Sequence, residues 1–347
     1  MNYLNDFYLF SFFILVSWFC IKLNIFFSNK YLLVDNPGNL KIHIENKLTA
    51  CGFSLFFIIM INLLIISTIN YFDIYNNYIN FNIIYIDNFW LLSLCLILIF
   101  LVSILDFFRD IPALTRLIIQ ISLVYLCFSS TFQNEITFFI PYRLEILLVI
   151  YIWLTVINTT NFIDGIDGLL SIKVLIFSIG IIILHYFLIF EIPLFILLTC
   201  FSLSAYFVVY LFYNKSPSKI MMSDIGSIPV GFLLGWMVII LFQKNNWQIP
   251  TFLLMYFYLD VFYTWAIKLI RSESIFKRHN DFTFHIAIKK GISTNKYLMY
   301  VLFLSLLNLT FMIIAKKLNS LDINILLLSL SFLSNLFFII IIRHKFL

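Results

Sequence analysis

Charged residues are scarce in this sequence. Asp, Glu, Lys and Arg make up 11% of the 347 residues, whereas 63% are hydrophobic. Soluble globular domains average about 25% charged and about 45–50% apolar residues, so the composition excludes an ordinary soluble domain. Together with the mean hydropathy of +1.03, it predicts a polytopic membrane protein. The net charge is +5. In a membrane protein the distribution of basic residues between the loops is more informative than this total, which does not indicate a nucleic-acid partner.

Patterned cysteines and flexible linkers are also missing. The five cysteines are scattered, with no C-x-x-C pair and no His/Cys ligand spacing, so we interpret them as small apolar fillers. The sequence has no Pro- or Gly-rich linker and no internal repeat. We therefore expect one integral-membrane domain over residues 1–347.

Long apolar runs fill most of the chain. A helix needs about 20 apolar residues to cross the hydrocarbon, and on that basis we expect eleven spans. They cover residues 7–27, 50–71, 87–105, 114–131, 144–159, 169–188, 193–213, 226–243, 249–269, 297–315 and 323–342.

The basic residues indicate the orientation of these spans. When the chain is threaded through eleven spans, every Lys and Arg lies on one face except Arg143, Lys244, Lys316 and Lys317. The positive-inside rule makes the richer face cytoplasmic. We therefore predict an all-α bundle of about eleven spans with its N-terminus outside and its C-terminus in the cytoplasm.

Seven aspartates fall in or beside loops of the same face. Solvation at a helix end explains any one of them, but a group of carboxylates at a membrane interface is unfavourable without a cation. Mg²⁺ is commonly held by one or two carboxylates and substrate phosphates, and the neighbouring basic residues match phosphate charge. The pattern indicates phosphoryl chemistry at a membrane surface. The seven are Asp35, Asp106, Asp110, Asp164, Asp167, Asp224 and Asp281.

The densest polar stretch is NTTNFIDGIDGLL, residues 158–170. Each aspartate in it precedes a glycine, which lets the backbone turn sharply or approach a ligand closely. Asn158 and Asn161 offer amides that can bond a sugar, a base or a carboxylate. A simple Asn/Asp/Gly turn between two helices is the alternative interpretation, but it leaves the other charged clusters of this face unexplained.

This stretch resembles the N-x-x-N-F-x-D-G-x-D-G-L signature of the polyprenyl-phosphate N-acetylhexosamine-1-phosphate transferases, which include the lipid I-forming enzyme. Three further segments are similar to loops of that family in the expected order. They are LVDNPGNLKIHIENKLTACG at 33–52, LDFFRDIPALTRLIIQ at 105–120 and NKSPSKIMMSDIGSIPVGFLLG at 214–235.

The resemblance implies a Mg²⁺-dependent enzyme, with Mn²⁺ as an alternative ion. It implies transfer of a sugar 1-phosphate from a UDP-N-acetylhexosamine-type sugar to undecaprenyl phosphate, with release of UMP, at the cytoplasmic face of the bacterial inner membrane. A homodimer is one option, and the identity of the sugar stays open.

The resemblance also assigns roles to individual residues. Asp224 is the implied Mg²⁺ ligand, and Asp106 is the candidate for activating or positioning the lipid phosphate. Asp164 and Asp167 are implied catalytic residues that line the nucleotide-sugar site with Asn161. Phosphate or carrier binding is implied for Lys41 and His43. The remaining substrate-binding candidates are Asn158, Asn214, Arg271 and His285.

Three departures from the family pattern stand out. Phe107 occupies the position of a second aspartate, and Ser223 replaces the glycine before the metal aspartate. In the segment 271–291, Ala287 and Ile288 stand where related sequences carry histidines, which hints at a different sugar. Because a phosphate monoester is already mostly ionised near neutrality, we expect activity to survive the loss at Phe107.

Two other classes of function remain open. A transporter would place carboxylates near the bilayer midplane, whereas the span interiors here are nearly free of charge and Asp260 is the main exception. We interpret Asp260 as a structural partner of Lys268 or Thr264, with a wall of the active site as the alternative. A catalytically impaired relative that acts as a partner subunit is the second class, and Phe107 is its best support.

Overall fold

The structure is a computed structural model that describes residues 3–31, 34–35, 47–49, 51–71, 89–131, 142–187, 192–244, 246–274 and 280–344. Helices dominate these residues, and the two strands are only two residues long. The elements are α1 (Tyr3–Lys30), β1 (Val34–Asp35), β2 (Lys47–Leu48), α2 (Gly52–Tyr71), α3 (Phe89–Arg109), α4 (Ala113–Thr131), α5 (Tyr142–Ile163), α6 (Leu169–Phe187), α7 (Leu194–Asn214), α8 (Asp224–Gln243), α9 (Gln248–Ile270), α10 (Thr283–Lys289), α11 (Thr294–Leu318) and α12 (Leu321–His344).

Each of the eleven expected spans corresponds to one long helix, and α10 is a short additional helix. Ten helices among the described residues are long and apolar enough to cross a membrane. The span expected at 114–131 is α4, whose apolar stretch Ala113–Ser129 is shorter than the others. The protein is therefore an all-α, polytopic membrane bundle, as the composition predicts.

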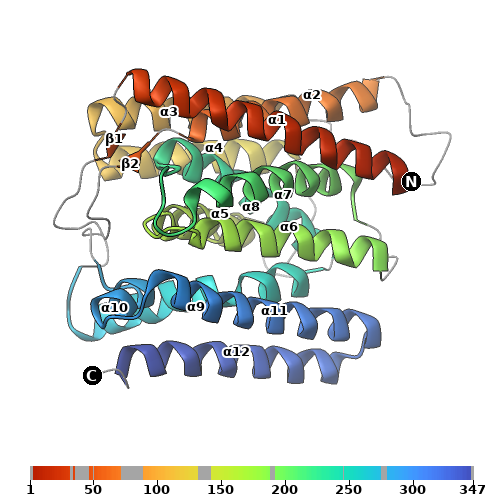
Figure 1. Ribbon diagram of the computed structural model, residues 1–347. Helices are drawn as coiled ribbons and strands as arrows, with labels where there is room; N and C mark the ends of the chain where they lie inside the picture. The colour runs from red at the N-terminus through yellow and green to blue at the C-terminus, as the bar shows by residue number, and fades with distance from the viewer. Residues whose placement is uncertain are drawn as a thin grey trace.

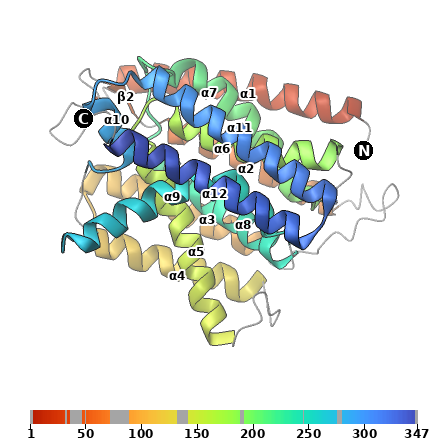
Figure 2. The same ribbon diagram turned by 90° about the horizontal axis from the view of Figure 1, so that it is seen from below.

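Helix α8 lies at the centre of the bundle, and nearly all of its residues are buried. It packs against α5, α3 and α2, while α7 packs against α6 and α1. The last helices, α9 (cyan), α11 and α12 (both blue), contact one another and form a layer at the bottom of Figure 1, which Figure 2 shows from below. Because lipid-exposed helices need no polar outer face, all of these helices are apolar over most of their surface.

Helices α5 and α8 pack closely against each other. Gly231 and Gly235 lie one turn apart on α8, and a Cβ atom at Gly235 would lie 2.1 Å from the Trp153 ring of α5. Small residues at this spacing let two helix backbones approach closely in a membrane. The Trp153 indole N–H then donates to the Phe232 carbonyl at 2.8 Å, which fixes the pair in register.

The ends of the helices that carry the family-like segments meet at one end of the bundle. Figure 1 shows β1, β2, α10 and the C-terminus together at that end, with the N-terminus at the other. We call it the motif end. Alternation of helix direction brings the C-terminal ends of α3, α5, α7 and α9 there, together with the N-terminal ends of α4, α6 and α8.

Candidate active site

Arg116, near the start of α4, joins two aspartates from different segments. Its Nη1 atom lies 2.6 Å from Oδ2 of Asp106, at the end of α3, and 3.1 Å from Oδ2 of Asp224, the first residue of α8. Because both carboxylates contact the same nitrogen atom, their oxygens lie within a few ångströms of each other. The structure therefore brings the metal and acceptor candidates of the sequence analysis together. The sequence analysis did not single out Arg116 and missed its position between the two carboxylates.

Asp106 is the more constrained of the two carboxylates. It is buried, and its Oδ1 accepts a hydrogen bond from the Ile111 backbone N–H at 2.8 Å. The Asp224 side chain is 39% exposed. Asp224 is consequently the carboxylate with room for further ligands, and Asp106 is already held by two donors.

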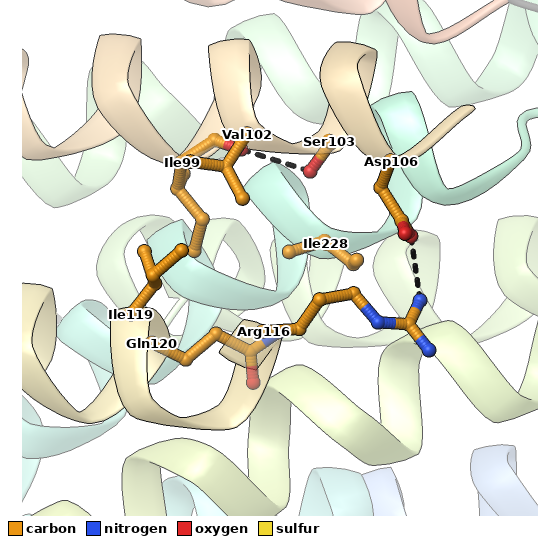
Figure 3. Close-up of a pocket in the computed structure, with 8 residues that line it drawn as sticks. All are labelled: Ile99, Val102, Ser103, Asp106, Arg116, Ile119, Gln120 and Ile228. Atoms are coloured by element: carbon orange, nitrogen blue, oxygen red, sulfur yellow. Dashed lines mark hydrogen bonds and ion pairs between the residues drawn. The ribbon is translucent and has the colours of Figure 1, made fainter. Parts of the chain in front are cut away.

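A pocket adjoins this charged pair between α3, α4 and α8. Figure 3 shows Asp106 and Arg116 facing each other at its edge. Its walls are formed mainly by Ile99, Val102, Ile119 and Ile228, and Ser103 and Gln120 complete the lining. The pocket is thus apolar along most of its length and charged at one end.

Phe107 packs in an apolar cluster beside the same carboxylates. Phe100 and Ile225 form the centre of this cluster, and Phe107 lies against it with Phe53, Phe56 and Ile104. The side chain therefore fills a packed apolar site next to the residue that follows Asp224. An aspartate at this position would put a carboxylate against apolar neighbours, which costs stability unless it finds a partner.

The turn between α5 and α6 is fixed by the segment that precedes α8. Gly168 has φ +78°, a conformation that glycine adopts without strain, and its N–H donates to Oδ1 of Asn214 at 2.8 Å. The Asn214 amide donates in turn to the Ile220 carbonyl at 2.8 Å. Gly165 has neither a positive φ nor a close neighbour, so only the second glycine of DGIDG is required by this geometry.

Asp167 forms the contacts that tie three segments together. Its Oδ1 accepts from Ser218 Oγ at 2.7 Å and its Oδ2 accepts from the Ser218 N–H at 3.1 Å. The Lys47 ammonium of β2 forms an ion pair with the same carboxylate. Backbone hydrogen bonds between Leu48 and Lys219 (3.3 Å) and between Met221 and Leu48 (2.8 Å) extend the junction. Lys47 is a site residue that the sequence analysis did not single out.

The first half of the signature is helical, because α5 continues to Ile163 instead of ending near 159. Thr159 and Thr160 bond back to the Val156 carbonyl at 3.1 and 2.6 Å, and the Asn158 amide bonds back to the Leu154 carbonyl at 2.9 Å. Asn158 therefore uses one of its donors within its own helix. Asn161 is half-buried.

Lys173 of the next helix contacts this helical part of the signature. It is fully buried in α6. Its Nζ donates to the hydroxyls of Thr159 and Thr160 at 3.0 and 2.9 Å.

Asp164 is buried at the end of the same turn. Burial raises the pKa of the Cys51 thiol above its ordinary value, and the negative charge of the Asp164 carboxylate raises it further. A thiol with a raised pKa is a poor nucleophile. Cys51, Cys95, Cys127 and Cys200 are all buried and form no disulfide among the described residues, which agrees with their interpretation as small apolar fillers.

Asp260 has a different partner from the one expected. It accepts the Thr283 N–H at 2.9 Å and lies 3.5 Å from the Arg343 guanidinium of α12. Lys268 pairs instead with Glu273 (3.1 Å) and Asp281 (2.9 Å). The Thr264 hydroxyl donates to the Asp260 backbone carbonyl at 2.7 Å, so the expected structural role and the partner Thr264 are supported. The partner Lys268 was wrong, because the cation beside the Asp260 carboxylate is Arg343, from the last turn of α12.

The remaining candidates are spread over the motif end. His285 is buried on α10 between the rings of Phe282 and Phe284. Arg271 is exposed just after α9. Lys41 and His43 lie outside the described residues, so their roles stay predictions.

Ser223 explains why a glycine suits the position before Asp224. Its backbone has φ 60° and ψ 174°, a region occupied almost only by glycine, and other residues cost about 1–3 kcal/mol there. Its buried hydroxyl also has no hydrogen-bond partner among the residues that the structure describes. The serine therefore strains the segment that carries the metal candidate.

We expect Ser223→Gly to stabilise the protein by about 1–2 kcal/mol, because it removes both the strain and the unsatisfied hydroxyl. The measurement is the thermal unfolding midpoint in detergent. Ser223→Ala is the matched control, since it removes the hydroxyl but keeps Cβ. A Ser223→Ala variant as stable as Ser223→Gly would contradict the assignment of backbone strain.

The donor set of Asp106 and Asp224 fits a hard divalent cation. No group of three or more His, Cys, Asp or Glu side chains converges among the described residues. Mg²⁺ usually takes only one or two protein carboxylates and completes its octahedral shell with water and phosphate oxygens. Two carboxylates in contact with one guanidinium match that requirement, with Asp224 as the more accessible.

Taken together, these contacts define a polytopic α-helical membrane protein with two groups of paired charges at one end of the bundle, Asp106/Arg116/Asp224 and Asp167/Lys47. The sequence model of glycosyl transferase family 4 matches residues 89–242, which include Asp106, Arg116, the 158–170 signature and Asp224. This match covers less than half of the chain, and it supports the resemblance found in the motifs.

Curated relatives match shorter segments. The chain is 36% identical over 87 residues to a phospho-N-acetylmuramoyl-pentapeptide-transferase of Streptococcus suis, covering 25% of each protein. It is 33% identical over 135 residues to the Petrotoga mobilis protein of the same name, covering 36% of this chain and 40% of that relative. The Streptococcus mutans protein is 34% identical over 108 residues, covering 30% and 31%. The matched segments thus span well under half the length of these relatives.

Proposed function

We propose that this protein transfers an N-acetylhexosamine 1-phosphate from a UDP-sugar to undecaprenyl phosphate and releases UMP. The observation that carries the proposal is the Arg116 contact with both Asp106 and Asp224. The junction of Asp167 with Lys47 and Ser218 lies at the same end of the bundle, so the family-like segments gather at the motif end. The product would begin a lipid-linked glycan of the cell envelope, of the O-antigen type.

The chemistry is a phosphoryl transfer. A phosphate oxygen of the acceptor forms a bond to the phosphorus that carries the sugar, and the bond from that phosphorus to the UMP oxygen breaks. Such reactions depend mainly on positioning and charge neutralisation. Asp224, with Asp106, would hold Mg²⁺ (or Mn²⁺), which supplies charge neutralisation to the phosphate oxygens when bound.

The chain's own residues have distinct roles in this proposal. Arg116 binds the acceptor phosphate, and Asp106 orients Arg116 through their ion pair. The small pocket beside them places apolar side chains of α3, α4 and α8 next to the charged end, so the surroundings of Arg116 are mainly apolar. Asp164 and Asp167 contribute to the donor site, and Asn161 and Asn214 support its turn. We place the motif end on the cytoplasmic side of the bacterial inner membrane, where the basic residues favour it.

The test is an assay of UMP release from purified protein with Mg²⁺, undecaprenyl phosphate and a panel of UDP-sugars. We expect release with at least one acetamido sugar. The panel should include GlcNAc, QuiNAc and FucNAc, because a pocket distinguishes such sugars by a few hydrogen bonds. No release with any sugar, in a detergent where a relative is active, would favour the impaired partner subunit suggested by Phe107.

A further inference from the structure

The last turn of α12 enters a buried polar network beside α10. Arg343 Nε donates to Thr283 Oγ1 at 2.9 Å, and its Nη2 donates to the Asp281 carbonyl at 2.7 Å. The same nitrogen contacts the hydroxyl of Thr264 and lies 3.5 Å from the carboxylate of Asp260, both on α9. One side chain near the end of the sequence thus joins α9, α12 and the segment that leads into α10.

Both ends of α10 are fastened by this arrangement. At its start, the Thr283 N–H donates to Asp260 Oδ1 at 2.9 Å. Just after its end, Lys290 Nζ donates to the carbonyls of Ile342 and Arg343 at 3.2 and 2.6 Å, where the last carbonyls of α12 lack partners within their own helix. Because α10 is only seven residues long, these contacts determine its position.

Helix α10 is in turn connected to the signature turn. The ring of Phe282, directly before α10, stacks on Phe162 with centroids 5.2 Å apart and an interplanar angle of 28°. Phe162 lies inside the signature, two residues before Asp164. Phe282 also stacks on His285, with centroids 5.9 Å apart. A continuous series of contacts therefore runs from Arg343 through Thr283 and Phe282 to the turn that carries the two aspartates.

Helix α12 has other attachments and does not need Arg343 to stay in the bundle. It packs along α11, where the Asn335 amide donates to Asn308 Oδ1 at 3.0 Å and the Ser331 hydroxyl donates to the same oxygen at 2.8 Å. The distinctive contacts of Arg343 are those with α9 and the start of α10.

We propose that Arg343 is a positioning residue for the nucleotide-sugar site, acting through α10 and the Phe162–Phe282 stack. This rests on the proposed function for the identity of the donor. Arg343 touches no residue to which we assign catalysis, so its effect falls on the placement of the donor-side turn and leaves the acceptor side at Arg116 and Asp106 unchanged.

The test compares Arg343→Met with the double variant Asp260→Asn/Arg343→Met, which avoids leaving an uncompensated buried carboxylate. We expect the KM for the UDP-sugar to rise about tenfold in both, because small displacements of binding groups have effects of this size or more. The KM for undecaprenyl phosphate stays unchanged, and Arg343→Lys restores part of the donor affinity. Amide hydrogen exchange in residues 158–168 and 280–290 becomes faster in both Met variants.

Asn335→Leu is the matched control, since it disturbs α12 away from α10, and we expect both KM values to stay unchanged. An unchanged donor KM in the double variant, or equal shifts for both substrates, would overturn the proposal while leaving the proposed function intact. If the wild-type protein released no UMP with any sugar, the proposed function would fail instead. In that case unchanged exchange at 158–168 in the double variant would overturn the positioning role independently.

Discussion

Asp224→Asn lowers the rate of UMP release by about 10³-fold or more, since it removes the accessible carboxylate of the site. Asparagine keeps the size of the side chain and an oxygen that can accept from Arg116, so the geometry is disturbed little. What is lost is the negative charge that would hold the cation against the phosphates. Losses of about 10²–10³ follow removal of a single electrostatic group in an active site, and the loss of a metal affects several phosphate oxygens at once.

Two measurements check this result. One is the initial rate of UMP release as a function of Mg²⁺ concentration, and the other is the shift of the unfolding midpoint on adding Mg²⁺ without substrates. Both responses should vanish in Asp224→Asn. Asp322→Asn, at the opposite end of the bundle in the first turn of α12, is the control and should behave like the wild type. Full activity in Asp224→Asn would show that the metal assignment is wrong.

The second large effect is expected from Arg116→Gln. This variant leaves Asp106 and Asp224 facing each other without their shared cation, and it removes the group that binds the acceptor phosphate. We expect the rate to fall by about 10²-fold with a higher KM for undecaprenyl phosphate, because a charged guanidinium stabilises phosphate oxygens far better than a neutral amide.

The same variant has a second consequence that activity alone would not reveal. Two carboxylates that lose their guanidinium repel each other, so a divalent cation should stabilise the variant more than the wild type. The Mg²⁺-induced shift of the unfolding midpoint should therefore be larger in Arg116→Gln. Arg109→Gln removes an exposed arginine from the end of α3 and serves as the control. A wild-type Mg²⁺ response together with a wild-type KM for undecaprenyl phosphate in Arg116→Gln would refute the bridging role of Arg116.

The signature turn shows how far the motifs alone could lead. The 158–170 stretch indicated a polar turn with two aspartates, and Gly168 does adopt the positive φ that its glycine allows. The partners of Asp167 were not predictable, because Lys47 and Ser218 are separated from it by 120 and 51 residues. Such pairs depend on which helices are neighbours, and helices that are apolar on all sides carry little information about their neighbours in a membrane.

Asp260 makes the same point from an expectation that was only partly correct. Local spacing on α9 favoured Lys268 and Thr264 as its partners, and Thr264 does bond to the Asp260 carbonyl. The cation beside the carboxylate, however, is Arg343 of α12 and not Lys268. Ser223 is the opposite case: its motif position marked it as a departure, and the structure supplied the physical reason in its backbone angles.

The sequence by itself determined the all-α membrane class, the number of long helices and the presence of the motif segments. Apolar length sets each span, and alternating direction places every second connection at the same end. Only the tertiary structure decided that Arg116 lies between Asp106 and Asp224, that Lys47 pairs with Asp167 and that Arg343 fastens α10. These contacts depend on how the helices pack side by side. Side-chain shape and the close approach of backbones control that packing, and the hydrophobic pattern of the sequence does not encode it.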